Sequence, residues 1–179
     1  MISIGVDVGG TCTRVGAVDD TGHLLRGTRL LTPPNANGAS LVALIARTFR
    51  TIAESSESSG DSIDVVGLAL PGIVDATTGR LIRSVNLPDV EGYPIAIALG
   101  DEIGLPVHLL SDIQAATWAE YGALDSKTDR FVHLRLGTGA GLCAILHGQL
   151  EAQDAARRTH HPLLVVDAAQ TAAECPCGL

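Results

Sequence analysis

Apolar residues recur at every second position over residues 2–8, which is the spacing of a β-strand with one buried face. Short apolar runs follow over 14–18 and 23–31, and the turn sequence Asp19-Asp20-Thr21-Gly22 separates them. Three consecutive strands with short links predict an antiparallel meander at the front of the chain.

Beyond residue 33 the pattern changes to helical spacing that alternates with short apolar runs. A helix is predicted after the N-cap candidate Ser40, followed by a polar connection over 54–62. Further helices are predicted over 93–103, where Gly104 stands at the C-terminal glycine position, and from Asp112 to about Tyr121. The remaining expected strands cover residues 64–70, 107–110, 131–136 and 142–146.

This order of strands first, and then strands alternating with helices, predicts an α/β fold whose mixed sheet is partly antiparallel. One arrangement occurs twice, because a strand, a glycine-rich loop and a second strand lie around residue 10 and again around residue 138. The repetition predicts two related halves, each with its own glycine loop.

The length of 179 residues suits one domain, or one small domain and part of another. Hydrophobic residues make up 46% and charged residues 18%, which is enough apolar side chain for a packed core. The net charge of -8 and an aromatic content of 3% speak against a nucleic-acid partner. A small anionic ligand remains compatible with this charge, because backbone N–H groups bind phosphate locally.

The chain opens directly with the first strand, so a secretory signal is not expected. No apolar run reaches the roughly 20 residues of a membrane span. Cys12 and Cys143 are isolated, and Cys175 and Cys177 form a tight pair, which is not the framework of a secreted disulfide protein. The pattern favours a cytoplasmic protein with free thiols and no membrane partner.

The segment Asp7-Val8-Gly9-Gly10-Thr11 combines a carboxylate with a glycine loop at the end of the first strand. Two glycines let the backbone approach a phosphate, and a carboxylate at a strand end can hold a hydrated Mg²⁺. The alternative is that the glycines only form a tight hairpin. A second loop, Gly137-Thr138-Gly139-Ala140-Gly141, lacks the setting of a dinucleotide site, but the two loops together predict a two-sided phosphate clamp.

Asp112 follows a buried strand and begins a helix, so it is expected at the carboxyl end of a sheet strand, where α/β folds bind ligands. A carboxylate there can accept a proton from a substrate hydroxyl, and the alternative is an aspartate that only caps the helix. Near the end, Cys175-Pro176-Cys177-Gly178 is compatible with a zinc site that includes His160 or His161. Such a site normally has four ligands, and the alternative is a tail with idle thiols.

Seven short motifs occur in a fixed order along nearly the whole chain. They are Gly5-Val6-Asp7-Val8-Gly9-Gly10-Thr11, Leu70-Pro71-Gly72-Ile73-Val74-Asp75, Asn86-Leu87-Pro88, Leu105-Pro106-Val107, Ser111-Asp112-Ile113-Gln114-Ala115-Ala116, Leu136-Gly137-Thr138-Gly139-Ala140-Gly141 and Cys175-Pro176-Cys177-Gly178. This set resembles the ROK family (repressor, open reading frame, kinase), which includes bacterial sugar kinases such as glucokinases. The ordered set is far more specific than any one of its motifs.

The resemblance implies the actin-like ATPase fold, related to ribonuclease H, in which a mixed sheet has flanking helices and two lobes close over a cleft. It implies ATP-dependent phosphorylation of glucose or a similar hexose, with Mg²⁺, by a cytoplasmic enzyme that forms a homo-oligomer, a dimer, at full length. Residues 1–112 would be the small lobe, and residues 113–179 would begin the larger lobe, which would stay incomplete.

The resemblance also implies roles for individual residues. Asp112 matches the catalytic base. The phosphate contacts match Asp7, Gly9, Gly10 and Thr11 in the first loop and Gly137, Thr138 and Gly139 in the second. The sugar-binding positions match Gly72, Asn86, Ser111, Asp112 and His161. The zinc ligands match His161, Cys175 and Cys177.

Several positions depart from the family pattern. Ser111 stands where the family has Asn, Cys12 where it often has Lys, and Leu142-Cys143 where it has glycines. Arg158 replaces a sugar-binding Glu, and a guanidinium cannot accept a hydrogen bond from a sugar hydroxyl. These departures support a second hypothesis, a non-catalytic ROK-fold protein that binds sugar or regulates.

A DNA-binding repressor is the least favoured hypothesis, because Met1 leads directly into the first strand and leaves no room for a DNA-reading helical module. At the other end, the chain stops at Leu179, before the third cysteine of the family's zinc segment. The motif order therefore predicts a kinase truncated before the end of its zinc motif.

Overall fold

The computed structural model describes residues 2–57, 62–136 and 140–151. The chain divides into two compact units, which we call unit 1 (Met1–Asp112) and unit 2 (Ile113–Leu179). The two units are built on separate sheets. The first and largest sheet lies in unit 1.

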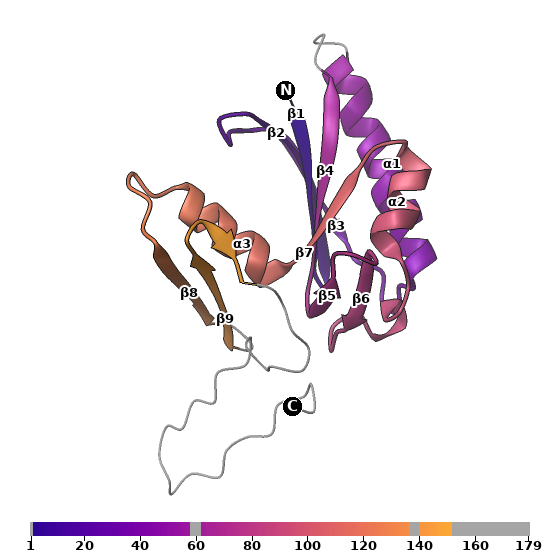
Figure 1. The fold of residues 1–179 in the computed structure, drawn as a ribbon. Helices are drawn as coiled ribbons and strands as arrows, with labels where there is room; N and C mark the ends of the chain where they lie inside the picture. The colour runs from indigo at the N-terminus through magenta and orange to yellow at the C-terminus, as the bar shows by residue number, and fades with distance from the viewer. Residues whose placement is uncertain (1, 58–61, 137–139, 152–179) are drawn as a thin grey trace, which may run out of the picture. The chain divides into compact units, whose positions relative to one another are not determined.

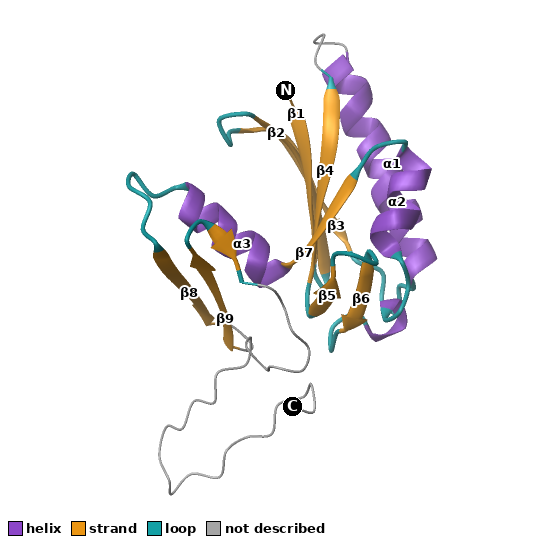
Figure 2. Ribbon diagram, viewed as in Figure 1, coloured by secondary structure: helices purple, strands orange, loops and turns teal. Residues whose placement is uncertain are grey.

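Unit 1 is built on a five-stranded mixed sheet in the order β3-β2-β1-β4-β7 (Figures 1 and 2). Its strands are β1 (Ile2–Val8), β2 (Cys12–Asp19), β3 (Leu24–Leu31), β4 (Ile63–Leu70) and β7 (Val107–Ser111). The first three pair antiparallel, whereas β4 pairs parallel with β1 and β7 pairs parallel with β4. The expected meander and the expected mixed α/β sheet are both confirmed.

Helices α1 (Gly38–Glu57) and α2 (Ile95–Ile103) lie together on one face of this sheet (Figure 2). Alternate residues of β1, such as Ile4 and Val8, point into the core between sheet and helices, where Leu41 and Ile45 of α1 are also fully buried. Each such side chain contributes roughly 1.5–3 kcal/mol on burial. The period-two pattern of β1 is therefore the signature of a sheet with helices on one face.

The expected start of α1 at Ser40 is wrong, because the helix begins at Gly38. Asn37 caps the helix instead, since its Oδ1 accepts the Ser40 N–H at 2.9 Å. An added Cβ at Gly38 would overlap the ring of Tyr93, so only glycine fits at this first position. The expected polar connection also begins too early, because α1 continues to Glu57 with no Gly or Pro to end it.

Three short elements of unit 1 were not expected from the sequence. Strands β5 (Ile73–Asp75) and β6 (Arg80–Arg83) form a separate antiparallel pair, and the 3-10 helix η1 (Pro88–Val90) follows. The chain of the β5–β6 turn folds around Asp75, whose Oδ1 accepts the Thr77 N–H at 2.9 Å. Elements of three or four residues are too short to show a period.

Unit 2 contains α3 (Asp112–Gly122), whose first residue still belongs to unit 1, and a three-stranded antiparallel sheet in the order β10-β9-β8. The strands are β8 (Arg130–Leu136), β9 (Ala140–Leu146) and β10 (Gln149–Leu150). The strands expected over 131–136 and 142–146 are confirmed. The turn between β9 and β10 has left-handed residues at His147 (φ 51°) and Gly148 (φ 77°), which suits a two-residue hairpin.

Helix α3 packs on one face of this sheet, since Thr117 of the helix lies 3.2 Å from His133 of β8. On the opposite face of β8, Val132, Leu134 and Leu136 are 59%, 49% and 70% exposed. Unit 2 thus shows one covered and one uncovered apolar face within the described residues. Among those residues, none of the helices has the length and apolar character needed to cross a membrane.

Candidate active site

The carboxyl ends of the three parallel strands of unit 1 meet at one edge of the sheet. Asp7 of β1 pairs with Ala69 of β4, and Leu70 of β4 pairs with Ser111 of β7. The glycine loop after β1, the Pro71-Gly72 turn after β4 and Asp112 after β7 therefore begin side by side. This is the edge at which open α/β sheets bind ligands.

Thr32 fixes the first glycine loop in place. Its Oγ1 donates to Gly9 O at 2.7 Å, and its backbone N–H donates to Thr11 O at 3.0 Å. Thr32 is itself buried and lies 2.9 Å from the Thr13 hydroxyl. Within the part of the chain that the structure describes, the N–H groups of Gly10 and Thr11 donate to no other group. The loop therefore presents two fixed backbone donors, which is what a phosphate oxygen needs.

Gly10 and Asn86, two of the predicted site residues, lie against each other. An added Cβ on Gly10 would stand 3.1 Å from the Asn86 Cβ. Ser84 shapes the segment that carries Asn86, because its Oγ accepts the N–H groups of Asn86 at 3.3 Å and Leu87 at 3.2 Å. Glu91 in turn accepts the Ser84 N–H at 2.7 Å. The predicted phosphate loop and one predicted sugar contact are thus neighbours in space.

The Asp7 side chain is half-exposed and forms an ion pair with Arg14, with 2.8 Å between Oδ2 and the guanidinium. Arg29 on the neighbouring strand donates from Nε to Cys12 Sγ at 2.8 Å. A guanidinium therefore stands beside Cys12. Nothing in the sequence pattern singled out Arg29, because its role depends on the register between β2 and β3.

Gly72 has a purely structural reason to be glycine. Its φ of 117° is strained for any other residue, and an added Cβ would overlap the carbonyl oxygen of Arg83. The turn after β4 therefore lies directly against the backbone that leads to Ser84 and Asn86. This close approach explains the glycine without reference to a ligand.

Ser111 and Asp112 end β7 and begin α3. Ser111 is fully buried, while Asp112 is partly exposed. Asp112 supplies the negative charge in the first turn of α3, where the helix dipole favours it. Both interpretations of Asp112, as a helix-start residue and as a base at the sheet edge, agree with this position.

The other predicted residues lie outside the described part of the chain. They are Gly137, Thr138 and Gly139 of the second loop, and His161, Cys175 and Cys177 of the zinc set. In the described ranges, none of the His, Cys, Asp and Glu side chains gather in groups of three or more that could hold a metal ion. Of the two glycine loops, only the first thus lies within the described residues.

Two carboxylates of unit 1 have lowered pKa values, and both close turns away from the sheet edge. The hydroxyl of Thr78, together with the Thr78 and Thr77 N–H groups, lowers the pKa of Asp75. The Thr21 hydroxyl and the His23 N–H lower the pKa of Asp19 in the same way. In unit 2, burial raises the pKa of the Cys143 thiol. These shifts are explained by turn geometry and packing.

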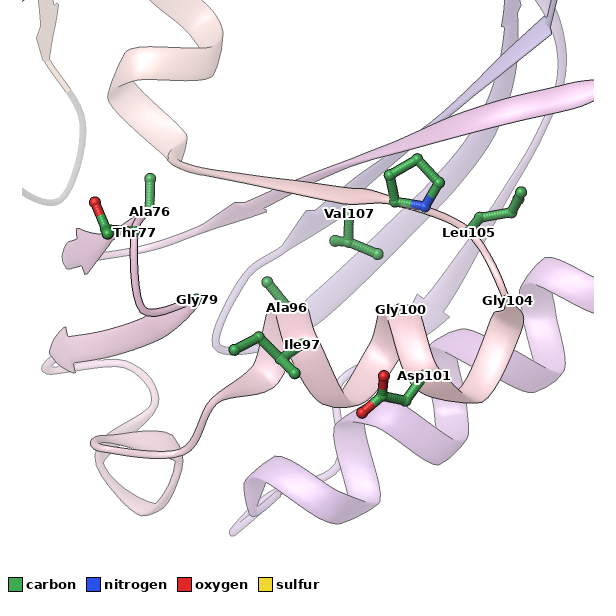
Figure 3. Close-up of a pocket in the computed structure, with 11 residues that line it drawn as sticks. Ala76, Thr77, Gly79, Ala96, Ile97, Gly100, Asp101, Gly104, Leu105 and Val107 are labelled. Atoms are coloured by element: carbon green, nitrogen blue, oxygen red, sulfur yellow. The ribbon is translucent and has the colours of Figure 1, made fainter.

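A groove of about 440 Å³ on unit 1 lies between α2 and the β5–β6 turn (Figure 3). Ile97 and Asp101 come from α2, and Ala76 and Thr77 come from the turn (Figure 3). Its lining also includes Gly79, Ala96, Gly100, Gly104, Leu105, Pro106 and Val107. None of the sequence-predicted site residues lines this groove, so it is separate from the sheet edge.

Comparison with known protein families matches residues 3–179 to the ROK family. An N-acetylmannosamine kinase of Yersinia pestis (strain Pestoides F) is 31% identical over 150 residues, which are 82% of this chain and 48% of that protein. The chain thus spans about half the length of the curated relatives it matches.

Solved structures show the same likeness. A ROK hexokinase from Thermus thermophilus is similar with a TM-score of 0.71 and 29% identity, over 84% of this chain and 49% of that chain. A ROK family glucokinase from Streptomyces griseus, in complex with glucose and AMPPNP, is similar with a TM-score of 0.69 and 31% identity. The match covers 84% of this chain and 46% of that chain. The α/β fold expected from the resemblance is confirmed.

Proposed function

Because this chain belongs to the ROK family, we propose that it provides the sugar-binding and phosphate-binding edge of an ATP-dependent hexose kinase. One observation carries the proposal. The strand register brings the Gly9-Gly10-Thr11 loop and Asp112 to a single sheet edge, and Asn86 lies beside Gly10. The Streptomyces griseus relative, which holds glucose and AMPPNP, supports a sugar and a nucleotide as the two ligands.

Asp112 is the base of the proposed reaction. Its carboxylate accepts the proton of a hexose hydroxyl while that oxygen attacks the terminal phosphoryl group of ATP, and ADP leaves. A positioned base contributes about 10²–10⁴-fold in rate. Asp112 stands in the first turn of α3, where the helix dipole favours a negative charge.

The backbone of the first loop binds the donor phosphates. The N–H groups of Gly10 and Thr11 donate to phosphate oxygens, and Thr32 holds the loop in that shape before the ligand arrives. Gly137, Thr138 and Gly139, which lie outside the described residues, are the second set of phosphate contacts in this proposal. Phosphoryl transfer depends mainly on such positioning and charge neutralisation, so a loop without lysine is sufficient in principle.

Asp7 fits a hydrated Mg²⁺, because its carboxylate is half-exposed and retains one oxygen beyond the Oδ2 bound to Arg14. The ion would neutralise charge on the donor phosphates. A zinc ion is proposed at His161, Cys175 and Cys177, which are suitable N and S ligands but one short of a closed structural set. The ions and a dimeric assembly in the cytoplasm stay predictions.

The acceptor is proposed to be glucose or a similar hexose, bound by Gly72, Asn86, Ser111, Asp112 and His161. Asn86 is the best placed of these in the structure, since it lies beside Gly10. A side-chain amide both donates and accepts hydrogen bonds, which suits a sugar hydroxyl. The class of acceptor, a hexose, is the broader proposal, and glucose is the specific hexose proposed within it.

The decisive measurement is hexose-dependent ADP release by the protein, with glucose, mannose and N-acetylmannosamine tested in parallel. Asp112→Asn is expected to lower kcat by about 10²–10⁴-fold, because an amide cannot accept the proton. Asp101→Asn, on the exposed surface of α2, is the matched control and should leave kcat unchanged. Undiminished activity in Asp112→Asn would exclude Asp112 as the base.

The departures at Ser111 and Arg158 favour a second candidate function, a protein of this fold that binds sugar without phosphorylating it. Calorimetry with the same three hexoses separates the two. Hexose binding with no ADP release at any sugar concentration would support the non-catalytic function, whereas turnover of any of the three sugars would exclude it.

A further inference from the structure

The helix that begins with Asp112 is attached to the sheet of unit 2 through the residues that follow the aspartate. Ile113 packs on Gly141, where an added Cβ would stand 3.4 Å from Ile113 Cδ1. Gln114 is buried and donates from Nε2 to Glu151 O at 3.2 Å. Both contacts lie within the first turn of α3, next to the proposed base.

Thr117, one turn further on, connects the helix to β8. Its Oγ1 donates to Ile113 O at 2.6 Å and lies 3.2 Å from His133 Nδ1. A threonine hydroxyl has one proton, and Ile113 O receives it. His133 must therefore carry a proton on Nδ1 and donate it to the Thr117 oxygen.

The two bonds form a chain from β8 to the first turn of α3, running from His133 Nδ1–H through the Thr117 hydroxyl to the carbonyl of Ile113. We call it the His133–Thr117 relay. Thr117 is fully buried, so no solvent competes for these bonds, and each strengthens the other. The relay ends one residue after Asp112.

We propose that Thr117 and His133 are positioning residues for Asp112. The relay holds the Ile113 carbonyl, and with it the orientation of the first turn, so that the Asp112 carboxylate points at the sugar hydroxyl. The proposal deepens the function proposed above and rests on Asp112 being the base. A displacement of about 1 Å in a catalytic group lowers the rate by as much as 10²-fold. Loss of the hydrogen bonds of the relay, although each is weak, should therefore lower the rate of phosphoryl transfer strongly.

Thr48 in α1 provides the contrast. It is also buried, and its Oγ1 donates to the carbonyl four residues earlier, Leu44 O, at 2.8 Å. Among the described residues, however, no side chain from another element donates to it. Thr48 thus hydrogen-bonds only within its own helix among the described residues. It therefore offers a matched control for Thr117.

The test compares Thr117→Val with Thr48→Val in the full 179-residue chain. The carboxyl carbon of Asp112 is followed by NMR, and its titration is recorded. Thr117→Val is expected to shift the Asp112 resonance and its titration midpoint, because the first turn loses its tether. Thr48→Val should change neither. Thr117→Ser, which keeps the hydroxyl, should restore the wild-type resonance.

His133 is tested by a second pair of variants that leaves the helix sequence intact. His133→Phe keeps an aromatic ring but removes the donor, and it should shift the Asp112 resonance in the same direction as Thr117→Val. His133→Asn keeps an N–H donor near the Nδ1 position and should shift it less. In the kinase assay, Thr117→Val should lower kcat on the order of tenfold or more with KM nearly unchanged.

Two results would overturn the proposal. One is an unshifted Asp112 resonance in both Thr117→Val and His133→Phe while the backbone spectrum shows a folded protein. The other is an equal shift in Thr48→Val, which would reveal general loosening. Both results are NMR observations that do not depend on enzyme turnover. Full activity in Asp112→Asn would therefore contradict the role of Asp112 as the base, while the His133–Thr117 relay could still be detected by NMR.

Discussion

The two units share one motif and differ in what is added to it. Each contains an antiparallel meander, β1-β2-β3 in unit 1 and β8-β9-β10 in unit 2, with glycines between its first two strands. Unit 1 then adds the parallel strands β4 and β7, whereas the described part of unit 2 adds none. Antiparallel neighbours end at opposite edges, so only parallel strands bring several carboxyl ends together. The candidate chemistry lies where the parallel strands are.

The uncovered sheet faces differ as well. On the face of unit 1 away from α1 and α2, the centre carries glycines, since Gly5 of β1 lies in register between Gly16 and Gly67, and the strongly exposed apolar side chains Leu24 and Leu31 belong to the edge strand β3. On the uncovered face of β8, Val132, Leu134 and Leu136 are exposed. We therefore expect substitutions near the carboxyl ends of the parallel strands to affect unit 1. Substitutions at α3 and on the apolar face of β8 should affect unit 2.

Gly72→Ala should have the largest effect on stability and should act on unit 1. The new Cβ would overlap the Arg83 carbonyl oxygen at a φ of 117°, so we expect a loss of about 3 kcal/mol or more in the free energy of unfolding. Urea denaturation followed by circular dichroism measures it. Gly92→Ala, where φ is also positive but space is open, should lose only about 1 kcal/mol.

Lys127→Met should have the next largest effect and should act on unit 2. The Lys127 ammonium donates to Tyr121 O at 2.5 Å and Gly122 O at 2.7 Å, and it lies 5.0 Å from the Tyr121 ring centroid. Losing a cation from a helix C-terminus should lower the free energy of unfolding by about 1 kcal/mol. Trp118, the chain's single tryptophan, reports the change by fluorescence, and Lys127→Arg should retain most of the stability.

Leu134→Gln should change stability little and surface behaviour more. The side chain is 49% exposed, so the free energy of unfolding should stay within about 0.5 kcal/mol of wild type. Binding of a hydrophobic dye should fall, because the variant interrupts the apolar row of β8. Unaltered dye binding would mean that this face is covered in solution.

The smallest effect should appear in acid and should come from Asp75. Its pKa is lowered chiefly by the Thr78 hydroxyl, so its contribution to stability is present above the unfolded value near 3.8 and is lost as the pH falls through the lower folded value. Asp75→Asn should therefore be less stable than wild type at pH 7, and the gap should narrow as the pH falls below 3.8. Thermal melts at pH 7 and over a series of acid pH values measure it, with Asp101→Asn as the control. A gap that persists in acid would contradict the assignment.

The sequence predicted those parts of the fold whose cause is local. The alternation in β1 follows from one buried face, and Gly104 ends α2 in the left-handed conformation with φ 72°, as expected. The start of α1 was wrong because Asn37, and not Ser40, caps the helix, and Gly38 leaves room for Tyr93, 55 residues further along the chain.

The residues of the candidate site also fall into those with a local sequence signal and those without one. Asp112 and the first glycine loop could be named from their place after predicted strands. Thr32 and Ser84, which hold the loop and the Asn86 segment, could not, since a single threonine or serine shows no pattern until its partners are known. The roles of the predicted site residues stay predictions that the proposed experiments test.

Asp112 is the last residue of unit 1 and the first of α3, and this makes the two units poorly separable as gene fragments. A fragment ending at Asp112 would put a terminal carboxylate directly beside the aspartate side chain. A fragment beginning at Ile113 would put a terminal ammonium at a helix N-terminus, where positive charge is unfavourable. Both halves would be damaged at the same peptide bond, so recombination or domain exchange in this lineage should place its crossover points elsewhere.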